Sequence, residues 1–201
     1  MLDKYIVPRI KPPLRYIATL IHGRGFSADQ VTAAGFLIGL LCVVCLANEW
    51  YWLALVLLLF NRLFDGVDGE LARLGTPSDA GGFLDITLDF IFYAIFPLGF
   101  AFAAPASNAI PAAVLIASFV GTGASFLAFT SMADKHNIEH PEFAYKGLYY
   151  LDGLAEGTET VLCFILMCLL PEQFALIAWL FAALCIITAI NRVVFGYRTL
   201  R

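Results

Sequence analysis

Six apolar segments, each long enough to cross a lipid bilayer, dominate this sequence. A transmembrane helix needs about 20 mostly apolar residues. Segments of that order lie at about 28–47, 50–72, 81–104, 109–132, 153–170 and 173–191. Only 14% of the residues are charged, whereas soluble domains contain about 25% charged residues. We therefore predict an all-α, polytopic membrane protein with six transmembrane helices.

The uneven distribution of lysine and arginine predicts the orientation of these helices. Basic residues precede the first segment, lie between the second and third and between the fourth and fifth, and end the chain. The other connections, near 48–49, 105–108 and 171–172, contain no Lys or Arg. Because cytoplasmic loops carry the excess of these residues, both termini are expected on the cytoplasmic side.

The N-terminal part of the chain differs in composition from the membrane segments. We expect residues 1–26 to form a cytoplasmic interfacial segment with an amphipathic helix on the membrane surface, and residues 27–201 to form the membrane domain. Three prolines are expected to break any single helix through this segment: Pro8, Pro12 and Pro13. Ser27 or Asp29 can cap the first transmembrane helix. Another interfacial helix is expected at about 134–152.

Four aspartates and an arginine lie within or at the edges of the second and third apolar segments: Asp65, Asp68, Asp85, Asp89 and Arg62. Even on the gentler insertion scales, an acid at the centre of a transmembrane helix costs about 2.5–3.5 kcal/mol. Four uncompensated acids would cost on the order of 10 kcal/mol, comparable to the net stability of a typical domain. One arginine cannot neutralise four carboxylates, so a bound divalent cation is the simplest source of the missing positive charge.

The spacing of the aspartates brings them together near the cytoplasmic ends of two neighbouring helices. Asp65 and Asp68 are three residues apart and Asp85 and Asp89 are four apart, so each pair lies on one helix face. Oxygen ligands without imidazole or thiolate suit Mg²⁺ or Mn²⁺, and two such ions form the usual clamp for displacement at phosphorus. We expect a two-cation phosphate site, with a structural or transport ion-pair cluster as the alternative.

Small residues and a second arginine accompany the aspartates. Glycines at 66, 69, 81 and 82 leave room for a phosphate or nucleotide near the backbone, and Arg73 is placed to pair with a phosphate. The pattern resembles the complete signature of the CDP-alcohol phosphotransferase family (class I CDP-alcohol phosphatidyltransferases): Asp65-x2-Asp68-Gly69-x2-Ala72-Arg73-x7-Gly81-x3-Asp85-x3-Asp89. The whole chain resembles a proteobacterial inner-membrane subgroup described as phosphatidylglycerophosphate-synthase-like.

This resemblance implies a role for each position of the signature. Asp65, Asp68 and Asp85 would bind two divalent cations, Mg²⁺ or Mn²⁺, and Asp89 would complete the second site and act as general base. CDP-diacylglycerol would be bound by the residues that precede the third segment or open it: Asp65, Asp68, Gly69, Ala72, Arg73 and Gly81. Gly69, Ala72 and Gly81 would line the cytidine pocket, and Arg73 would hold the diphosphate. The implied reaction is attack of an acceptor hydroxyl on the lipid-side phosphorus, with release of CMP, at the cytoplasmic face of a bacterial inner membrane.

The acceptor alcohol lies outside the signature. Glycerol 3-phosphate, giving phosphatidylglycerophosphate, is preferred from the resemblance and because Lys135, Lys146 and Arg192 are available on the cytoplasmic side to bind a phosphate. The positive-inside bias alone also accounts for these three residues. Inositol phosphate, serine and glycerol remain alternatives. An aspartate-rich membrane prenyltransferase and an ion-coupled transporter are more distant ones.

Small residues in the fourth segment bear on assembly. Ala117, Gly121 and Ser125 follow the spacing that lets helices approach closely in lipid. The neighbouring helix could belong to the same chain or to a second copy, and a homodimer is preferred. Membrane lipids are the other expected partners, and nucleic acid is not expected.

Overall fold

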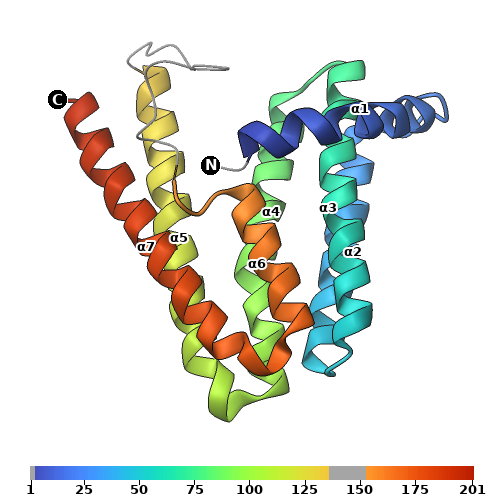
Figure 1. Ribbon diagram of the computed structural model, residues 1–201. Helices are drawn as coiled ribbons and strands as arrows, with labels where there is room; N and C mark the ends of the chain where they lie inside the picture. Colours follow the sequence, from blue (N-terminus) through green and yellow to red (C-terminus); the bar gives the residue numbers. More distant parts are fainter. Residues whose placement is uncertain (1–2, 136–152) are drawn as a thin grey trace.

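The computed structural model describes residues 3–135 and 153–201, and nearly all of them are helical (Figure 1). The elements in chain order are α1 (Asp3–His22), α2 (Ala28–Ala47), α3 (Tyr51–Leu74), α4 (Asp79–Ala103), α5 (Pro105–Lys135), α6 (Gly157–Leu169), the 3-10 turn η1 (Pro171–Gln173) and α7 (Phe174–Thr199). The all-α prediction is confirmed. Each of the six predicted segments corresponds to one helix from α2 to α7.

The helices α2 to α7 form a bundle, and α1 lies across one end of it (Figure 1). Helix α2 packs against α3 and α4, α4 also packs against α5, and α5 pairs with α7. Helix α1 rests on α3. The C-terminal end of α7 and the connection between α3 and α4 both lie toward the end of the bundle that α1 covers (Figure 1).

Four of the helices are long and apolar enough to cross a membrane by length and composition: α2, α4, the first 29 residues of α5, and η1 with α7. Helix α3 has 24 residues but carries the charged residues of the signature near its end. Helix α6 has only 13 residues, about 20 Å at 1.5 Å per residue, which is less than the hydrocarbon core of about 30 Å. The count of six full transmembrane crossings therefore stays a prediction.

The expectation that the prolines break the N-terminal helix is wrong. Helix α1 is continuous from Asp3 to His22, with Pro8, Pro12 and Pro13 inside it. All three proline side chains are exposed, whereas the residues that face α3 follow a helical period: Leu14, Ile17, Ala18 and Ile21. The prolines thus lie on the exposed face of α1, and burial of the apolar residues on the opposite face stabilises the helix despite the backbone hydrogen bonds that proline cannot donate. The N-terminal amphipathic helix itself is present.

Helix α2 begins where the sequence predicts. Ser27 is its N-cap, and its hydroxyl accepts a hydrogen bond from the Gln30 amide at 3.2 Å. The Gln30 side chain accepts in return from the Ser27 amide at 3.1 Å. This capping box satisfies two backbone donors that a helix start otherwise leaves open.

The core of the bundle is aromatic. Phe92, Phe96 and Phe100 lie along one side of α4 and are fully buried. Phe96 stacks on Phe164 of α6 with 3.9 Å between the ring centroids, and Phe100 stacks on Phe174 of α7 at 4.4 Å. These contacts connect α4 to the C-terminal helices and fix the helix that carries Asp85 and Asp89.

Glycines allow the helices around α4 to approach closely. A methyl group at Gly39 of α2 would lie 2.8 Å from the Phe92 ring. In α5, a methyl group at Gly123 would lie 2.6 Å from the Phe90 ring, and one at Gly121 would lie 3.5 Å from the Ala189 side chain of α7. Gly121 and Gly123 therefore lie against neighbouring helices of the same chain, whereas Ala117 is exposed, and the homodimer stays a prediction.

The segment that enters α6 is anchored by one buried hydroxyl. Thr188 of α7 is fully buried, and its oxygen accepts hydrogen bonds from the Leu154 and Ala155 amides at 3.0 and 3.1 Å. A methyl group at Gly153 would lie 2.2 Å from Thr188. Residues 153–156 thus lie folded against α7, which is why α6 starts later than the predicted segment at about 153.

We expect Thr188→Val to destabilise the protein by about 2 kcal/mol or more, since each buried amide left without an acceptor costs about 1–3 kcal/mol. Thr188→Ser keeps the oxygen and loses only a methyl group, so it should cost about 1 kcal/mol. Thermal unfolding of both variants in detergent tests this. Equal stability of the two variants would show that the hydroxyl is not the anchor.

Candidate active site

The four aspartates of the signature line one small cavity between α2, α3 and α4. Its volume is about 20 Å³, and Thr32 and Arg62 share its wall with Asp65, Asp68, Asp85 and Asp89. A space of this size holds about one water molecule or ion. The convergence predicted from the spacing of the aspartates is therefore present in the structure.

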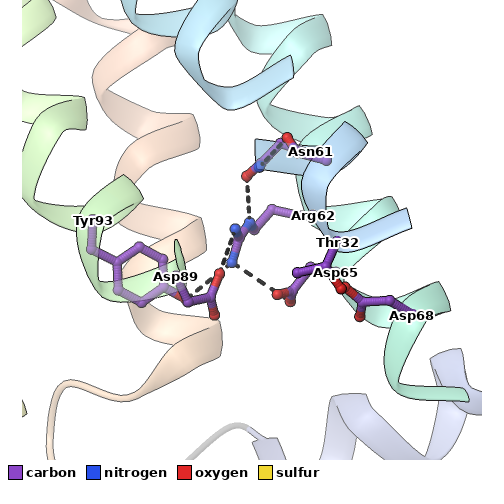
Figure 2. A network of polar contacts seen from close by, with 8 residues as sticks. Thr32, Asn61, Arg62, Asp65, Asp68, Asp89 and Tyr93 are labelled. Atoms are coloured by element: carbon purple, nitrogen blue, oxygen red, sulfur yellow. Dashed lines mark hydrogen bonds and ion pairs between the residues drawn. The ribbon is translucent and has the colours of Figure 1, made fainter. Parts of the chain in front are cut away.

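Arg62 of α3 joins the two helices that carry the aspartates (Figure 2). Its Nη2 lies 2.9 Å from Asp89 Oδ1 on α4, and its Nη1 lies 3.6 Å from Asp65 Oδ2 on α3. Nη1 also donates to the Tyr93 hydroxyl at 3.2 Å. The guanidinium carbon lies 5.0 Å from the centre of the Phe92 ring, within the range of a cation–π contact. The Arg62 guanidinium thus pairs with two carboxylates, one on each helix.

Asn61 extends this network to α2. The Arg62 Nε donates to Asn61 Oδ1 at 2.8 Å, and Asn61 Nδ2 donates to the Gly35 carbonyl of α2 at 2.8 Å. Asn61 is 3% exposed. Three helices therefore share one chain of polar contacts, which fixes the direction of the Arg62 side chain.

Asp68 is held differently from Asp65 and Asp89. The Thr32 hydroxyl of α2 donates to Asp68 Oδ2 at 2.6 Å. The other carboxylate oxygen, Oδ1, is buried with no hydrogen-bond partner in the part of the chain that the structure describes. A buried acceptor without a donor is costly, and a cation beside it would remove that cost.

The oxygen donors at the cavity suit a hard divalent cation in type but not in spacing. All four carboxylates border the same cavity, and the orphaned Asp68 oxygen leaves a ligand position open. Within residues 3–135 and 153–201, no three side chains of Asp, Glu, His or Cys are gathered closely enough to enclose a metal ion. Arg62 stands between Asp65 and Asp89 in this arrangement (Figure 2).

A larger cavity of about 370 Å³ adjoins the small one. Asp68, Asp85 and Thr32 line both cavities. The three small residues predicted for the nucleotide pocket all line the larger cavity: Gly69, Ala72 and Gly81. The larger cavity is thus continuous with the carboxylates and open to a group much larger than an ion.

The end of α1 and the start of α2 contribute residues that sequence reasoning missed. His22 and Asp29 also line the larger cavity. A methyl group at Gly81 would lie 2.9 Å from Asp29 Oδ1, so the glycine leaves room for this carboxylate. Asp29 was predicted only as a possible helix cap, and no pattern in the sequence connects it to Gly81.

Arg73 lies at the last turn of α3 and is not among the residues that line the larger cavity. Its side chain is 60% exposed and its Nη1 lies 2.6 Å from Glu70 Oε1, one turn earlier. A methyl group at Gly69 would lie 3.7 Å from the same Nη1. Arg73 is therefore next to the predicted nucleotide pocket, with its charge shared with Glu70.

Of the three basic residues predicted for the acceptor, the structure describes the side chain of Arg192 only. Lys135 ends α5 and its side chain is not described, and Lys146 lies outside the described residues. Arg192 of α7 lines a third cavity of about 340 Å³ together with Tyr93, Glu156 and Thr160. Its Nη1 donates to the Thr122 carbonyl at 3.3 Å. Tyr93 lines this cavity, and its hydroxyl accepts the hydrogen bond from Arg62, so the third cavity lies next to the Arg62 network.

Comparisons with known proteins agree with this arrangement. The model of the CDP-alcohol phosphatidyltransferase family matches residues 26–191. The chain belongs to the CDP-alcohol phosphatidyltransferase family, and is therefore by class a transferase of phosphatidyl groups in the membrane. The inner membrane protein YnjF of Escherichia coli (strain K12) is 52% identical over 201 residues, which are 100% of this chain and 98% of that protein.

Two further similarities concern proteins with named activities. The archaetidylinositol phosphate synthase of Pyrococcus horikoshii is 40% identical over 90 residues, which are 44% of this chain and 47% of that protein. The crystal structure of the Mycobacterium tuberculosis phosphatidylinositol phosphate synthase with CDP-DAG bound superposes with a TM-score of 0.67. It covers 92% of this chain and 93% of the other at 18% identity, which shows a shared fold.

We expect Gly69→Ala to weaken binding of CDP by about tenfold, since an extra methyl in a filled pocket costs about 1–3 kcal/mol. Among the side chains that the structure describes, only Arg73 comes within 4 Å of the added methyl, through its Nη1, so the fold should be retained. Isothermal titration calorimetry and thermal unfolding in detergent measure the two effects. Gly121→Ala is the matched control, because its methyl would make an ordinary contact with Ala189 outside the cavity. CDP binding by Gly69→Ala equal to wild type would mean that Gly69 does not line the nucleotide pocket.

Proposed function

We propose that the protein transfers the phosphatidyl group of CDP-diacylglycerol to a small hydroxyl acceptor and releases CMP. The observation that carries this proposal is the pair of adjoining cavities, one bordered by four carboxylates and the other by the small residues of the same signature. Membership of the phosphatidyltransferase family supports this chemistry over a prenyltransferase or an ion-coupled transporter.

The larger cavity is proposed to take the donor nucleotide. Gly69, Ala72 and Gly81 let the cytidine approach the backbone, and Asp65 and Asp68 contribute to binding from the carboxylate side. Arg73 binds the diphosphate, for which its two-pronged guanidinium suits the oxygen geometry. The solved relative that has CDP-DAG bound shares the fold, and this supports the assignment of the donor.

The carboxylates are proposed to hold two divalent cations, Mg²⁺ or Mn²⁺, for which the small cavity has room for one and the adjoining larger cavity, also lined by Asp68 and Asp85, has room for the other. Asp65, Asp68 and Asp85 are the ligands, and Asp89 completes the second site. When bound, these ions would neutralise the diphosphate and stabilise charge on the leaving oxygen. The orphaned Asp68 oxygen supports a cation at this position.

Asp89 is proposed as the general base. Its carboxylate removes the proton from the acceptor hydroxyl, and that oxygen forms a bond to the lipid-side phosphorus. The bond between this phosphorus and the bridging oxygen breaks, and CMP leaves with the electron pair. Arg62, Asn61 and the Gly35 carbonyl hold Asp89 in a fixed direction for this step.

The acceptor is proposed to be glycerol 3-phosphate, which would bind near Arg192 in the third cavity, with Lys135 and Lys146 as further candidates. Inositol phosphate is the second candidate, because relatives that match part of this chain are named archaetidylinositol phosphate synthase and phosphatidylinositol phosphate synthase. Both acceptors carry a phosphate, for which a basic residue at the cavity is a suitable partner. Serine and glycerol lack that group.

The setting of the reaction is part of the proposal. The distribution of basic residues supports cytoplasmic termini and a cytoplasmic active site, and the Escherichia coli relative is named an inner membrane protein. We also propose that residues 1–26 form the interfacial segment and residues 27–201 the membrane domain. The active form is proposed to be a homodimer.

Asp89→Asn should lower CMP release by about 100-fold or more, because it removes the general base, while CDP-diacylglycerol binding is largely kept. Asp65→Asn should lose a metal ligand and bind Mn²⁺ more weakly. CMP release from labelled CDP-diacylglycerol and Mn²⁺ titration separate the two effects. Full activity in both variants would show that the assigned roles are wrong.

The acceptor is tested with purified protein, labelled CDP-diacylglycerol and Mg²⁺ or Mn²⁺. Glycerol 3-phosphate, inositol phosphate, serine and glycerol are offered separately, and the lipid product and CMP are both measured. We expect a product with glycerol 3-phosphate and a lower yield in Arg192→Gln. A product from serine or glycerol alone would contradict the assignment of a phosphorylated acceptor.

A further inference from the structure

Arg62 is buried and every nitrogen of its guanidinium has a partner. Its side chain is 12% exposed, and its Nε, Nη1 and Nη2 contact Asn61, Tyr93 with Asp65, and Asp89 respectively. The rings of Phe92 and Tyr93 lie 5.0 and 5.3 Å from its central carbon. A side chain held on so many sides does not swing freely out of the cavity.

The position of Arg62 divides the carboxylate cavity into two unlike ends. Asp65 and Asp89 border only the small cavity and both lie against Arg62. Asp68 and Asp85 border both cavities, and Asp68 has an oxygen without a donor. The first end has its own positive charge, whereas within residues 3–135 and 153–201 no ion pair joins Asp68 or Asp85 to a Lys or Arg.

The following inference rests on the proposed function, because it concerns the cations proposed for that site. We propose that Arg62 is a built-in counterion that makes the two cation positions unequal. It holds Asp65 and Asp89 together when no divalent cation is bound, and it weakens cation binding at their end of the cavity. The end formed by Asp68 and Asp85 binds its cation first and more tightly.

Electrostatics gives this order. Two positive groups that share Asp65 and Asp89 repel each other, and repulsion between charges a few ångströms apart is strong where water is excluded. Among the described residues, Arg62 is the one Lys or Arg that lines either cavity, and it is paired with Asp65 and Asp89. A cation at the Asp68 end therefore avoids that pair and gains an unsatisfied oxygen. The second cation therefore gains most when the negative diphosphate of the donor enters the adjoining cavity.

Arg62 acts in this proposal as a positioning residue rather than a catalytic one. It touches Asp89, the proposed base, and no reacting atom. If Arg62 is a counterion, removal of its charge should tighten cation binding at the weaker site. A side chain that only holds the helices together would, when lost, loosen both sites.

The test is a Mn²⁺ titration of detergent-solubilised protein followed by electron paramagnetic resonance, without substrate. Wild type should show one tight and one weak site. In Arg62→Gln the weak site should tighten by about tenfold or more, with a much smaller change in the tight site. The matched control is Arg198→Gln, which removes an exposed positive charge from the last turn of α7. It should change the Mn²⁺ affinity of neither site.

Thermal unfolding supplies a second readout. In EDTA, Arg62→Gln should unfold at a lower temperature than wild type, and saturating Mn²⁺ should recover most of the loss. Should Arg62→Gln fail to fold, Arg62→Met removes the same charge with an unbranched side chain that fills irregular space, so its weak site should tighten by a similar factor. An unchanged or weakened second site in either variant overturns the proposal.

The outcomes for wild type separate this inference from the proposed function. Two Mn²⁺ sites and CMP release in wild type, with no change in Arg62 variants, would overturn only the counterion role. A wild-type protein that binds no Mn²⁺ would overturn the metal part of the proposed function and this inference with it.

Discussion

The ion pair between Arg62 and Asp89 joins α3 to α4 in a part of the bundle where neither charge could be left alone. Charged groups within a bilayer are costly unless they are paired or face a polar cavity, and both conditions are met here. Asp65 shares the same guanidinium, and Asn61 connects it to the backbone of α2. The architecture around the cavity therefore depends on one arginine that compensates carboxylates from two helices.

Close packing of the surrounding helices makes that compensation possible. A methyl group at Gly35 would lie 2.8 Å from Phe64, and one at Gly39 would lie 2.8 Å from Phe92, so α2 can approach α3 and α4 only through glycine. The same approach brings Thr32 to Asp68 and the Gly35 carbonyl to Asn61. The small residues on one face of α2 thus allow both the close approach of the three helices and the hydrogen bonds that α2 makes to Asp68 and Asn61.

Sequence patterns predict much of this arrangement because they depend on local geometry. Apolar runs predict where α2 to α7 lie, and the spacing of the aspartates predicts that they meet around one cavity. Contacts across helices have no such local signal: Thr32 is 36 residues from Asp68, and Asp29 reaches the larger cavity only through the fold. Arg62 is three residues before Asp65, but its contact with Asp89 depends on how α4 packs against α3. The prediction that prolines break α1 was wrong because the rule applies to isolated helices, whereas α1 buries an apolar face against α3.

Asp68 and Asp85 belong to two compartments at once, since each lines the small cavity and the larger one. Any substitution at either position alters both compartments together. Gly69 lines the larger cavity alone and Asp89 the small one alone. Substitutions at these two positions can therefore alter one compartment while the lining of the other stays as it is.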